Sequence, residues 1–260
     1  MSVLEQMEPI ALEAAKTVRL TNRMDNKYVA SADRLEELLE RVAERYYVQE
    51  IEASRVAPYR TLYFDTDDLA MYTMHHNGKL NRQKVRVRTY RLTDTTFFEL
   101  KNKDNKGRTS KVRLPIDVQM FDHPEEMPEV KEFVERLSPF TFHLSPFTSL
   151  HACLGNRFER ITLVDKEMRE RVTVDRNITF HNCFTDRDAD ISGILVVEVK
   201  HEAGVPQSEM EKALHEMHIQ PQKMSKYCIG TALTNPSVKK NCFKPTLSII
   251  NYQLSIKKNA

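Results

Sequence analysis

Several short segments of this chain alternate ionisable and apolar residues, and this alternation constrains the fold more than any other feature. The clearest segment is Lys84 to Arg88, which reads KVRVR. Because successive side chains of a β-strand point to opposite faces, its three cations share one face and its two valines the other. The pattern recurs at residues 97–101, 111–114, 171–175 and 197–200. Together these segments predict a sheet with one highly charged face, which needs a charged ligand.

Positive charge is concentrated on the expected strand faces. Eleven basic and four acidic residues give these faces a net charge of +7, against +2 for the whole chain. The residues are Arg23, Asp25, Lys27, Lys84, Arg86, Arg88, Glu99, Lys101, Lys111, Arg113, Arg160, Arg171, Asp175, Glu198 and Lys200. A single strand of this kind is explained as a solvated basic face. Several together favour a phosphate ligand, because arginine forks match phosphate oxygens and lysines add point charge.

The bulk composition is that of a soluble globular protein, with 260 residues, 40% hydrophobic and 29% charged. No apolar run approaches the roughly 20 residues of a membrane span. The acidic segment Met1 to Ala15 does not resemble a signal peptide. The cysteines Cys153, Cys183, Cys228 and Cys242 are widely spaced, which indicates neither a zinc site nor a disulfide framework. We therefore expect a cytoplasmic protein without a membrane span in this chain.

The pattern along the chain predicts alternating strands and helices in a single domain, residues 1–260. Its core covers about 19–233, and the sequence leaves the structure of the tail 235–260 open. We expect strands at 19–29, 60–65, 82–91, 94–102, 108–116, 157–165, 169–178 and 193–201. A helix capped by Ser31 would carry an apolar stripe from Leu35 to Tyr46. Further helices are expected within 66–74, at 124–137, at 207–217 and from Lys226, with Ser225 as its cap.

About eight antiparallel strands predict an α+β protein whose sheet closes into a barrel, because closure removes unpaired edges. A barrel of about eight strands can hold one small ligand. The apolar faces would pack under helices outside the sheet, so the charged faces would line the lumen. Since like charges in a low-dielectric enclosure repel, this tunnel needs a polyanion together with metal and water.

Two carboxylates and two histidines on or near these strands have alternative interpretations. Glu198 is either a salt-bridge partner of lumenal arginines or a ligand for Mg²⁺ or Mn²⁺, which bind carboxylate and phosphate oxygens. For Glu99, pairing with neighbouring cations is favoured. His75 and His76 are interpreted as surface histidines, although His75 could reach a phosphate at the tunnel mouth.

Other phosphate-binding modes fit less well. Nucleic-acid binding predicts aromatic residues that interleave with the charges and stack on bases. Tyr90, Phe97 and Phe158 share the charged faces, but they form no paired-aromatic motif, so no nucleic-acid partner is expected. The chain has only six glycines and no glycine-rich phosphate loop, which excludes P-loop and Rossmann modes. Phosphate must be gripped by side chains.

These residues resemble the triphosphate tunnel metalloenzyme superfamily, and within it the polyphosphate polymerase domain of the vacuolar transporter chaperone family and its bacterial relatives. The likeness runs from about Arg19 to Gly230, and its specificity lies in the order and spacing of the motifs. They are R-x-D-x-K-Y at Arg23 to Tyr28, Y-F-D-T at Tyr63 to Thr66, K-V-R-V-R-x-Y at Lys84 to Tyr90, F-E-L-K at Phe98 to Lys101, S-K-V-R at Ser110 to Arg113, F-E-R at Phe158 to Arg160, R-V-T-V-D at Arg171 to Asp175, V-E-V-K at Val197 to Lys200 and S-K-Y at Ser225 to Tyr227.

The resemblance implies an eight-stranded tunnel that transfers the terminal phosphoryl group of ATP to a growing polyphosphate. It implies that Glu198 holds the divalent metal, Mn²⁺ or Mg²⁺, and that Ser225 and Lys226 contact the phosphate chain. It implies phosphate contacts for Lys27, Arg86, Arg88, Lys101, Lys111, Arg160 and Arg171. Predicted to be catalytic are Lys27, Arg86, Arg88, Lys101, Arg160 and Glu198. The strand faces add Arg23, Lys84, Arg113 and Lys200 as phosphate-binding residues.

The sequence departs from the family pattern at three points. The triphosphatase branch carries E-x-E-x-K on its first strand, where this chain has Arg23 and Asp25, which favours the polymerase branch. Polymerases often have tyrosine at the position of Phe158. Eukaryotic polymerases are fused to a regulatory domain and membrane helices, and this sequence contains neither. A triphosphatase that hydrolyses inorganic or nucleoside triphosphate and a non-catalytic polyphosphate-binding module are the alternatives, and the oligomeric state stays open.

Overall fold

The computed structural model of the chain describes residues 2–18, 23–106, 108–137, 150–202 and 208–258. Its strands are β1 (Pro9–Ala11), β2 (Arg23–Ser31), β3 (Tyr46–Glu50), β4 (Ala57–Asp65), β5 (Arg82–Tyr90), β6 (Thr95–Lys103), β7 (Thr109–Ile116), β8 (His151–Asp165), β9 (Glu170–Asn182), β10 (Arg187–Asp190) and β11 (Ile194–Glu202). Its α-helices are α1 (Val3–Gln6), α2 (Leu12–Ala15), α3 (Leu35–Val42), α4 (Ala70–His76), α5 (Pro128–Leu137), α6 (Glu209–Glu216), α7 (Lys226–Thr234) and α8 (Lys244–Lys258), joined by short 3₁₀ turns.

One large sheet forms the centre of the molecule. Its main path runs in the order β2-β11-β9-β8-β4-β5-β6-β7, and each neighbouring pair on this path is antiparallel. These strands correspond to the eight that the sequence predicts. The short strands β1, β3 and β10 attach to this path and were not expected. The protein is thus a mixed α+β fold with a large antiparallel sheet.

The strand register places fourteen of the fifteen charged residues named above, all except Arg23, on one side of the sheet, which we call the charged face. Lys27 lies opposite Glu198, and Glu198 lies opposite Thr173 on the next strand. Arg86 lies opposite Glu99. Since directly paired residues of antiparallel strands point to the same side, one face collects the charges across the whole path. The side chain of Arg23 lies outside the described residues.

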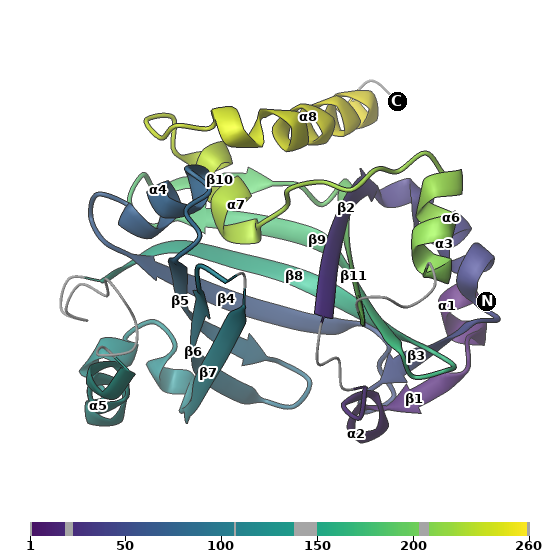
Figure 1. Cartoon of the computed structure of the whole chain (residues 1–260), viewed down its shortest axis with the longest axis horizontal. Helices are drawn as coiled ribbons and strands as arrows, with labels where there is room; N and C mark the ends of the chain where they lie inside the picture. The colour runs from purple at the N-terminus through teal and green to yellow at the C-terminus, as the bar shows by residue number, and fades with distance from the viewer. Residues whose placement is uncertain (1, 19–22, 107, 138–149, 203–207, 259–260) are drawn as a thin grey trace.

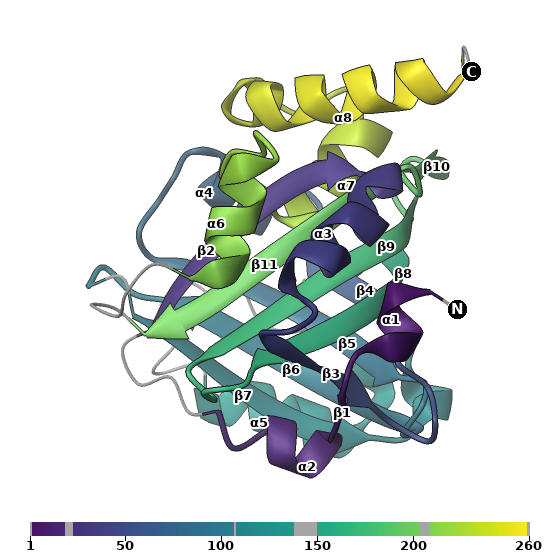
Figure 2. The ribbon, with the colours of Figure 1, turned by 90° about the vertical axis from the view of Figure 1, so that its right-hand side faces the viewer.

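The expected closed barrel is not found, because no hydrogen-bonded ladder joins the edge strands β2 and β7 in the part of the chain that the structure describes. The sheet instead curls (Figures 1 and 2). The curl brings distant strands together: burial lowers the pKa of Lys84 on β5, and the charge of Lys27 on β2 adds to the effect. Pro115 in β7 lacks a backbone N–H, which suits an unpaired edge.

Helices cover both faces of the sheet, although only the outer face was expected to be covered. On the outer face, α3 and α6 bury the apolar residues of β8, β9 and β11 (Figure 2), and α5 buries those of β5 and β6. In contrast, α7 and α8 pack at one end of the charged side, against residues such as Phe158, Phe180 and Val196. That end of the face is apolar, so it needs a cover of its own.

Smaller differences have local causes. The helix expected to reach Tyr46 ends at Val42, and Tyr46 begins β3 with its ring fully buried. Ser31 precedes a 3₁₀ turn, and its side chain makes no capping hydrogen bond. The tail left open by the sequence contains α8, which lies across the top of Figure 1. No helix of the described residues is long and apolar enough to cross a membrane.

Gly230 provides a test of the packing of α7. A Cβ atom there would overlap the Phe180 ring and lie 2.8 Å from Leu154 Cδ2. Gly230→Ala should therefore lower the free energy of unfolding by about 1 to 3 kcal/mol, as overpacking does. The matched control is Gly155→Ala, whose nearest contact would be an ordinary 3.7 Å to the His181 carbonyl oxygen. Urea denaturation that shows equal stability for both variants would contradict this packing.

Candidate functional site

The first charge cluster of the charged face centres on Glu198 of β11. Its two carboxylate oxygens pair with Lys27 Nζ and Lys200 Nζ, each at 3.0 Å. Burial alone would raise the pKa of Glu198, but the charges of Lys200 and Lys27 hold it well below its ordinary value. Glu198 therefore stays ionised. It forms the ion pairs that one interpretation predicts, and its anionic oxygens suit the metal binding that the other interpretation predicts.

The second cluster joins the sheet to helix α7. Arg160 binds Asp175 in bidentate fashion, with Nε and a terminal nitrogen at 2.6 and 2.8 Å from the two oxygens, and Lys226 of α7 pairs with the same carboxylate. Asp175 is 2% exposed. Burial opposes its ionisation, but Arg160 and Lys226 lower its pKa to about 2.

The third cluster lies on β5, β6 and β7. One oxygen of Glu99 accepts hydrogen bonds from Arg86 Nε at 2.7 Å and from a terminal nitrogen of Arg86 at 2.6 Å, and the other oxygen pairs with Lys111. Glu99 is 1% exposed, and although burial opposes it, Arg86, Arg88 and Lys111 lower its pKa to about 2. The predicted pairing of Glu99 is confirmed.

Four cations of the charged face that are buried or partly buried have no carboxylate in ion-pair contact among the described residues: Lys84, Arg88, Lys101 and Arg171. Lys84 and Arg88 donate only to hydroxyl groups, of Ser225 at 2.8 Å and of Thr61 at 3.1 Å. Burial lowers the pKa of all four, and that of Lys101 falls to about 8, with Lys84 adding to the effect of burial. Desolvation of these charges is costly, and an anion bound at this face would offset the cost.

Helix α7 directs its N-terminus at one of these cations, Lys84. Ser225 is its N-cap and accepts a hydrogen bond from the backbone N–H of Cys228 at 3.3 Å, as the sequence predicts. The Ser225 hydroxyl also accepts from Lys84, and Lys226 lies beside Asp175. Because a helix N-terminus carries partial positive charge and unpaired N–H groups, α7 adds to the attraction for an anion.

An aromatic pair lies among the cations, and the sequence analysis identified only one of its two residues, Phe158. The rings of Tyr59 and Phe158 stack at 5.0 Å between centroids. The guanidinium carbons of Arg88 and Arg160 lie 5.2 to 5.7 Å from both rings, and Lys226 Nζ lies 4.5 Å from the Phe158 ring. Aromatic faces attract cations, so Phe158 holds the cations in place without a hydroxyl. Tyr59 lies one residue before the expected strand 60–65. Extending the alternation of that strand backwards by one residue would have included Tyr59.

Two other predicted residues lie at the margins of the site. Arg113 of β7 stacks on Phe97, with its guanidinium carbon 4.4 Å from the ring centre. His75 does not reach out to a phosphate, because its Nε2 atom lies 3.1 Å from the backbone oxygen of Gln83 and ties α4 to β5. Burial and the charge of Lys84 lower the pKa of His75 to about 2, so it is neutral.

A divalent metal fits beside Glu198. Thr173, directly opposite Glu198 on the charged face, has a buried hydroxyl oxygen with no hydrogen-bond partner among the described residues. Carboxylate and hydroxyl oxygens suit Mg²⁺ or Mn²⁺, which take their remaining ligands from water and phosphate. The cluster of His123, Glu125 and Glu126 near α5 is a second group of ligand types in the described residues, but it lies off the charged face.

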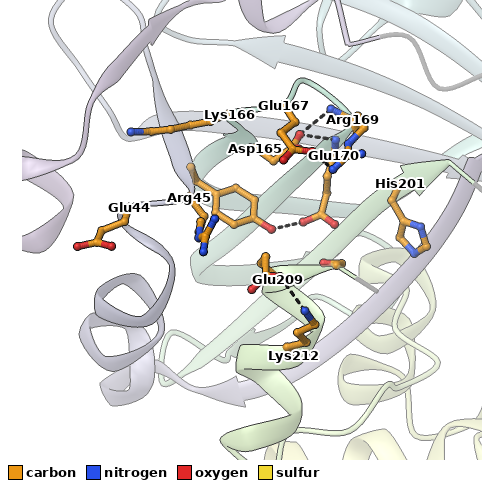
Figure 3. A pocket seen from close by; sticks show the side chains of 12 residues that line it. Glu44, Arg45, Asp165, Lys166, Glu167, Arg169, Glu170, His201, Glu209 and Lys212 are labelled. Carbon is orange, nitrogen blue, oxygen red and sulfur yellow. Dashed lines mark hydrogen bonds and ion pairs between the residues drawn. The ribbon is translucent and has the colours of Figure 1, made fainter. Parts of the chain in front are cut away.

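The outer face also has a small cavity, of about 270 Å³, which Figure 3 shows. It lies where β3, the β8–β9 turn, the end of β11 and the start of α6 meet. Its acids and bases largely pair with one another: Lys212 with Glu209, and Tyr46 with Glu170. None of the predicted site residues lines it, so it is separate from the charged face.

Comparisons with known proteins identify the family and similar folds. The family model of the VTC domain matches residues 22–235. A structure from Hippeastrum, an adenylyl cyclase candidate with a dominant triphosphatase activity, superposes with a TM-score of 0.51 at 14% identity, over 82% of this chain and 98% of its own. A Pyrococcus horikoshii protein gives a TM-score of 0.43 at 13% identity, over 81% and 98%. An adenylate cyclase candidate from Vibrio parahaemolyticus gives 0.44 at 8%, over 81% and 99%. No curated protein sequence matches the chain.

The buried lysines predict a specific pH dependence of stability. The pKa values of Lys101 and Lys200 are about 8, chiefly through burial, against 10.5 in an exposed lysine. Between pH 8 and 10 the unfolded chain then binds more protons, so these lysines make the free energy of unfolding rise with pH, by about 1 to 2 kcal/mol each.

Buried cysteine thiols titrate in the same range with the opposite sign, because burial raises their pKa. The measurement is therefore the difference in unfolding free energy between the wild type and a Lys101→Gln/Lys200→Gln variant, from urea denaturation at pH 7.5 and 9.5. From pH 7.5 to 9.5, the unfolding free energy of the wild type should increase relative to that of the variant. A difference that does not change with pH would contradict the depressed lysine pKa values.

Proposed function

Because the chain belongs to the VTC domain family, we propose that its curled sheet forms a tunnel that binds the triphosphate chain of ATP and extends inorganic polyphosphate. The products are ADP and a phosphate chain one unit longer. The fold shared with triphosphate tunnel proteins supports a triphosphate substrate. Binding of ATP as phosphoryl donor is consistent with the cytoplasmic location expected from the sequence.

The observation that carries the proposal is the set of four cations, one buried and three partly buried, that have no carboxylate partner among the described residues. Three come from the neighbouring strands β5 and β6, and Arg171 comes from β9, three positions away from β5 in the sheet order. Lys84 also contacts Ser225 at the N-terminus of α7. A compact anion would meet only part of such a set. A linear phosphate chain carries one charge or more on every unit and can contact all of them, so it matches the extended distribution.

In the reaction, a terminal oxygen of the polyphosphate chain attacks the γ-phosphorus of ATP. A new P–O bond forms, and the bond from the γ-phosphorus to the bridging oxygen breaks, so ADP leaves with the electron pair. We assign Arg86, Arg88, Arg160 and the lysines Lys27 and Lys101 to hold the two phosphate chains in line and to stabilise the charge that develops on the transferred group. Phosphoryl transfer depends mainly on such positioning and electrostatic stabilisation.

Transfer to a phosphate chain is favoured over hydrolysis by the state of the carboxylates. Hydrolysis benefits from a general base whose pKa lies near the working pH. The carboxylates Glu99, Asp175 and Glu198 all have strongly lowered pKa values because each is paired with two cations. A phosphate oxygen of the chain end is already anionic and needs no base. A triphosphatase that acts on inorganic or nucleoside triphosphate remains the second candidate, in line with the Hippeastrum neighbour.

The proposed metal site consists of Glu198 with the nearby Thr173 hydroxyl. A bound Mg²⁺ or Mn²⁺ would offset the negative charge of the phosphates. Lys27 and Lys200 pair with Glu198 in this structure, and we assign both lysines to phosphate binding beside the metal site.

Product analysis tests the proposal directly. The purified protein is incubated with ATP and MnCl₂ or MgCl₂, and ADP, orthophosphate and polyphosphate are measured separately. A polymerase yields long phosphate chains and releases one ADP for every phosphate unit added to them. Release of orthophosphate alone would establish the triphosphatase instead. If neither product forms while polyphosphate raises the melting temperature, the protein is a binding module.

Glu198→Gln tests the metal site. The amide is isosteric but neutral, so turnover should fall by at least about 100-fold, the scale of losing a principal electrostatic group, while the melting temperature stays near that of the wild type. The control is Glu159→Gln, which removes a comparable ion pair with Arg176, 2.9 Å long, on the outer face. Unaltered activity of Glu198→Gln, or equal losses in both variants, would refute the assignment.

A further inference from the structure

Two sequence motifs, Y-F-D-T at 63–66 and S-K-Y at 225–227, contribute residues that the proposed reaction does not use. The structure joins them: Tyr227 of α7 donates a short hydrogen bond to Asp65 at the end of β4. The two residues are 162 positions apart in the sequence. Asp65 has no exposed surface, and Tyr227 is 2% exposed. A buried polar contact of this kind between distant segments fixes their relative position.

Asp65 is itself held rigidly. Its Oδ1 atom accepts from the backbone N–H groups of Thr66 at 2.8 Å and Met71 at 2.9 Å, and its Oδ2 atom accepts from that of Tyr72 at 2.9 Å. These donors include the first turn of α4, whose N-cap Leu69 supplies no side-chain cap. The carboxylate therefore takes the place of the missing cap. It has one remaining strong donor, the Tyr227 hydroxyl.

Tyr227 directly follows the two residues of α7 that reach the charged face. Ser225 accepts from Lys84, and Lys226 pairs with Asp175 and lies over Phe158. Further along the helix, Gly230 fixes the middle of α7 against Leu154 and Phe180. This contact holds the middle of the helix. In the first turn, the Tyr227 side chain adds its hydrogen bond to Asp65 and a ring contact with Tyr63, 5.2 Å between centroids.

We infer that Asp65 and Tyr227 form a positioning pair that holds the first turn of α7, so that Ser225 and Lys226 meet the phosphate chain on the charged face. The inference rests on the proposed phosphate-binding function. The pair touches no substrate. It acts through Lys226, and its removal should weaken phosphate binding only as far as Lys226 and Ser225 contribute to it.

The test is a double-mutant cycle on the binding of inorganic tripolyphosphate, measured by calorimetry. Tyr227→Phe keeps the ring and leaves Asp65 its three backbone donors, so the variant should fold, which circular dichroism and a thermal melt check. Because the pair acts only through Ser225 and Lys226, the loss of its hydrogen bond should raise Kd by only about 5-fold, less than a direct hydrogen bond to a charged group is worth. Lys226→Met should raise it about 10-fold. The double variant should bind within about twofold of Lys226→Met, because residues that act through one another are not additive.

The matched control is Tyr72→Phe. It also removes one buried tyrosine hydrogen bond, to the backbone oxygen of Lys239 at 2.7 Å, but this bond holds the chain after α7 and not its first turn. Tyr72→Phe should lower the melting temperature and leave Kd unchanged.

The outcomes separate this inference from the proposed function. If Tyr227→Phe lowers the melting temperature but binds like the wild type, or if the two losses multiply in the double variant, the positioning role is wrong and the proposed function is unaffected. If the wild type does not bind tripolyphosphate at all, the proposed function itself fails. The positioning role is supported if the losses of tripolyphosphate affinity are non-additive and Tyr72→Phe binds with the same Kd as the wild type.

Discussion

The constraint on which this structure depends is the excess of buried positive charge on one face of the sheet. Three carboxylates each neutralise two cations, yet Lys84, Arg88, Lys101 and Arg171 keep no acidic partner among the described residues. Desolvation of unpaired charges is costly. The apolar outer face, with α3, α5 and α6 packed on it, supplies the burial that holds these charges together. The proposed phosphate chain would relieve their repulsion.

Helix α7 makes the two ends of the basic sheet face different. It lies on the charged side, where its mostly buried residues close one end of the face, and its N-terminus points at Lys84. Lys226 connects it to Asp175, and Tyr227 connects it to Asp65. The helix therefore couples the apolar core at one end of the sheet to the electrostatics of the site, so packing and ligand binding are not independent.

Much of this arrangement was predictable from residues taken one strand at a time. The period of two in KVRVR and its counterparts assigned fifteen residues to one face, and the ladder register confirms this shared face for the fourteen whose side chains the structure describes. The capping serine of α7 and the pairing of Glu99 were also predicted correctly. Other features depend on contacts between distant segments: Tyr59 stacking on Phe158, Lys226 reaching Asp175, and Tyr46 entering a strand instead of extending a helix.

The sequence by itself determined which side chains share a face, because alternation along an extended backbone is a local property. Only the tertiary structure decided how that face is bounded. The curl brings Lys27 near Lys84, no ladder joins β2 to β7 in the described residues, and α7 and α8 cover one end. These outcomes depend on how whole strands and helices pack, and that is set by apolar contacts summed over many distant residues, which no single segment encodes.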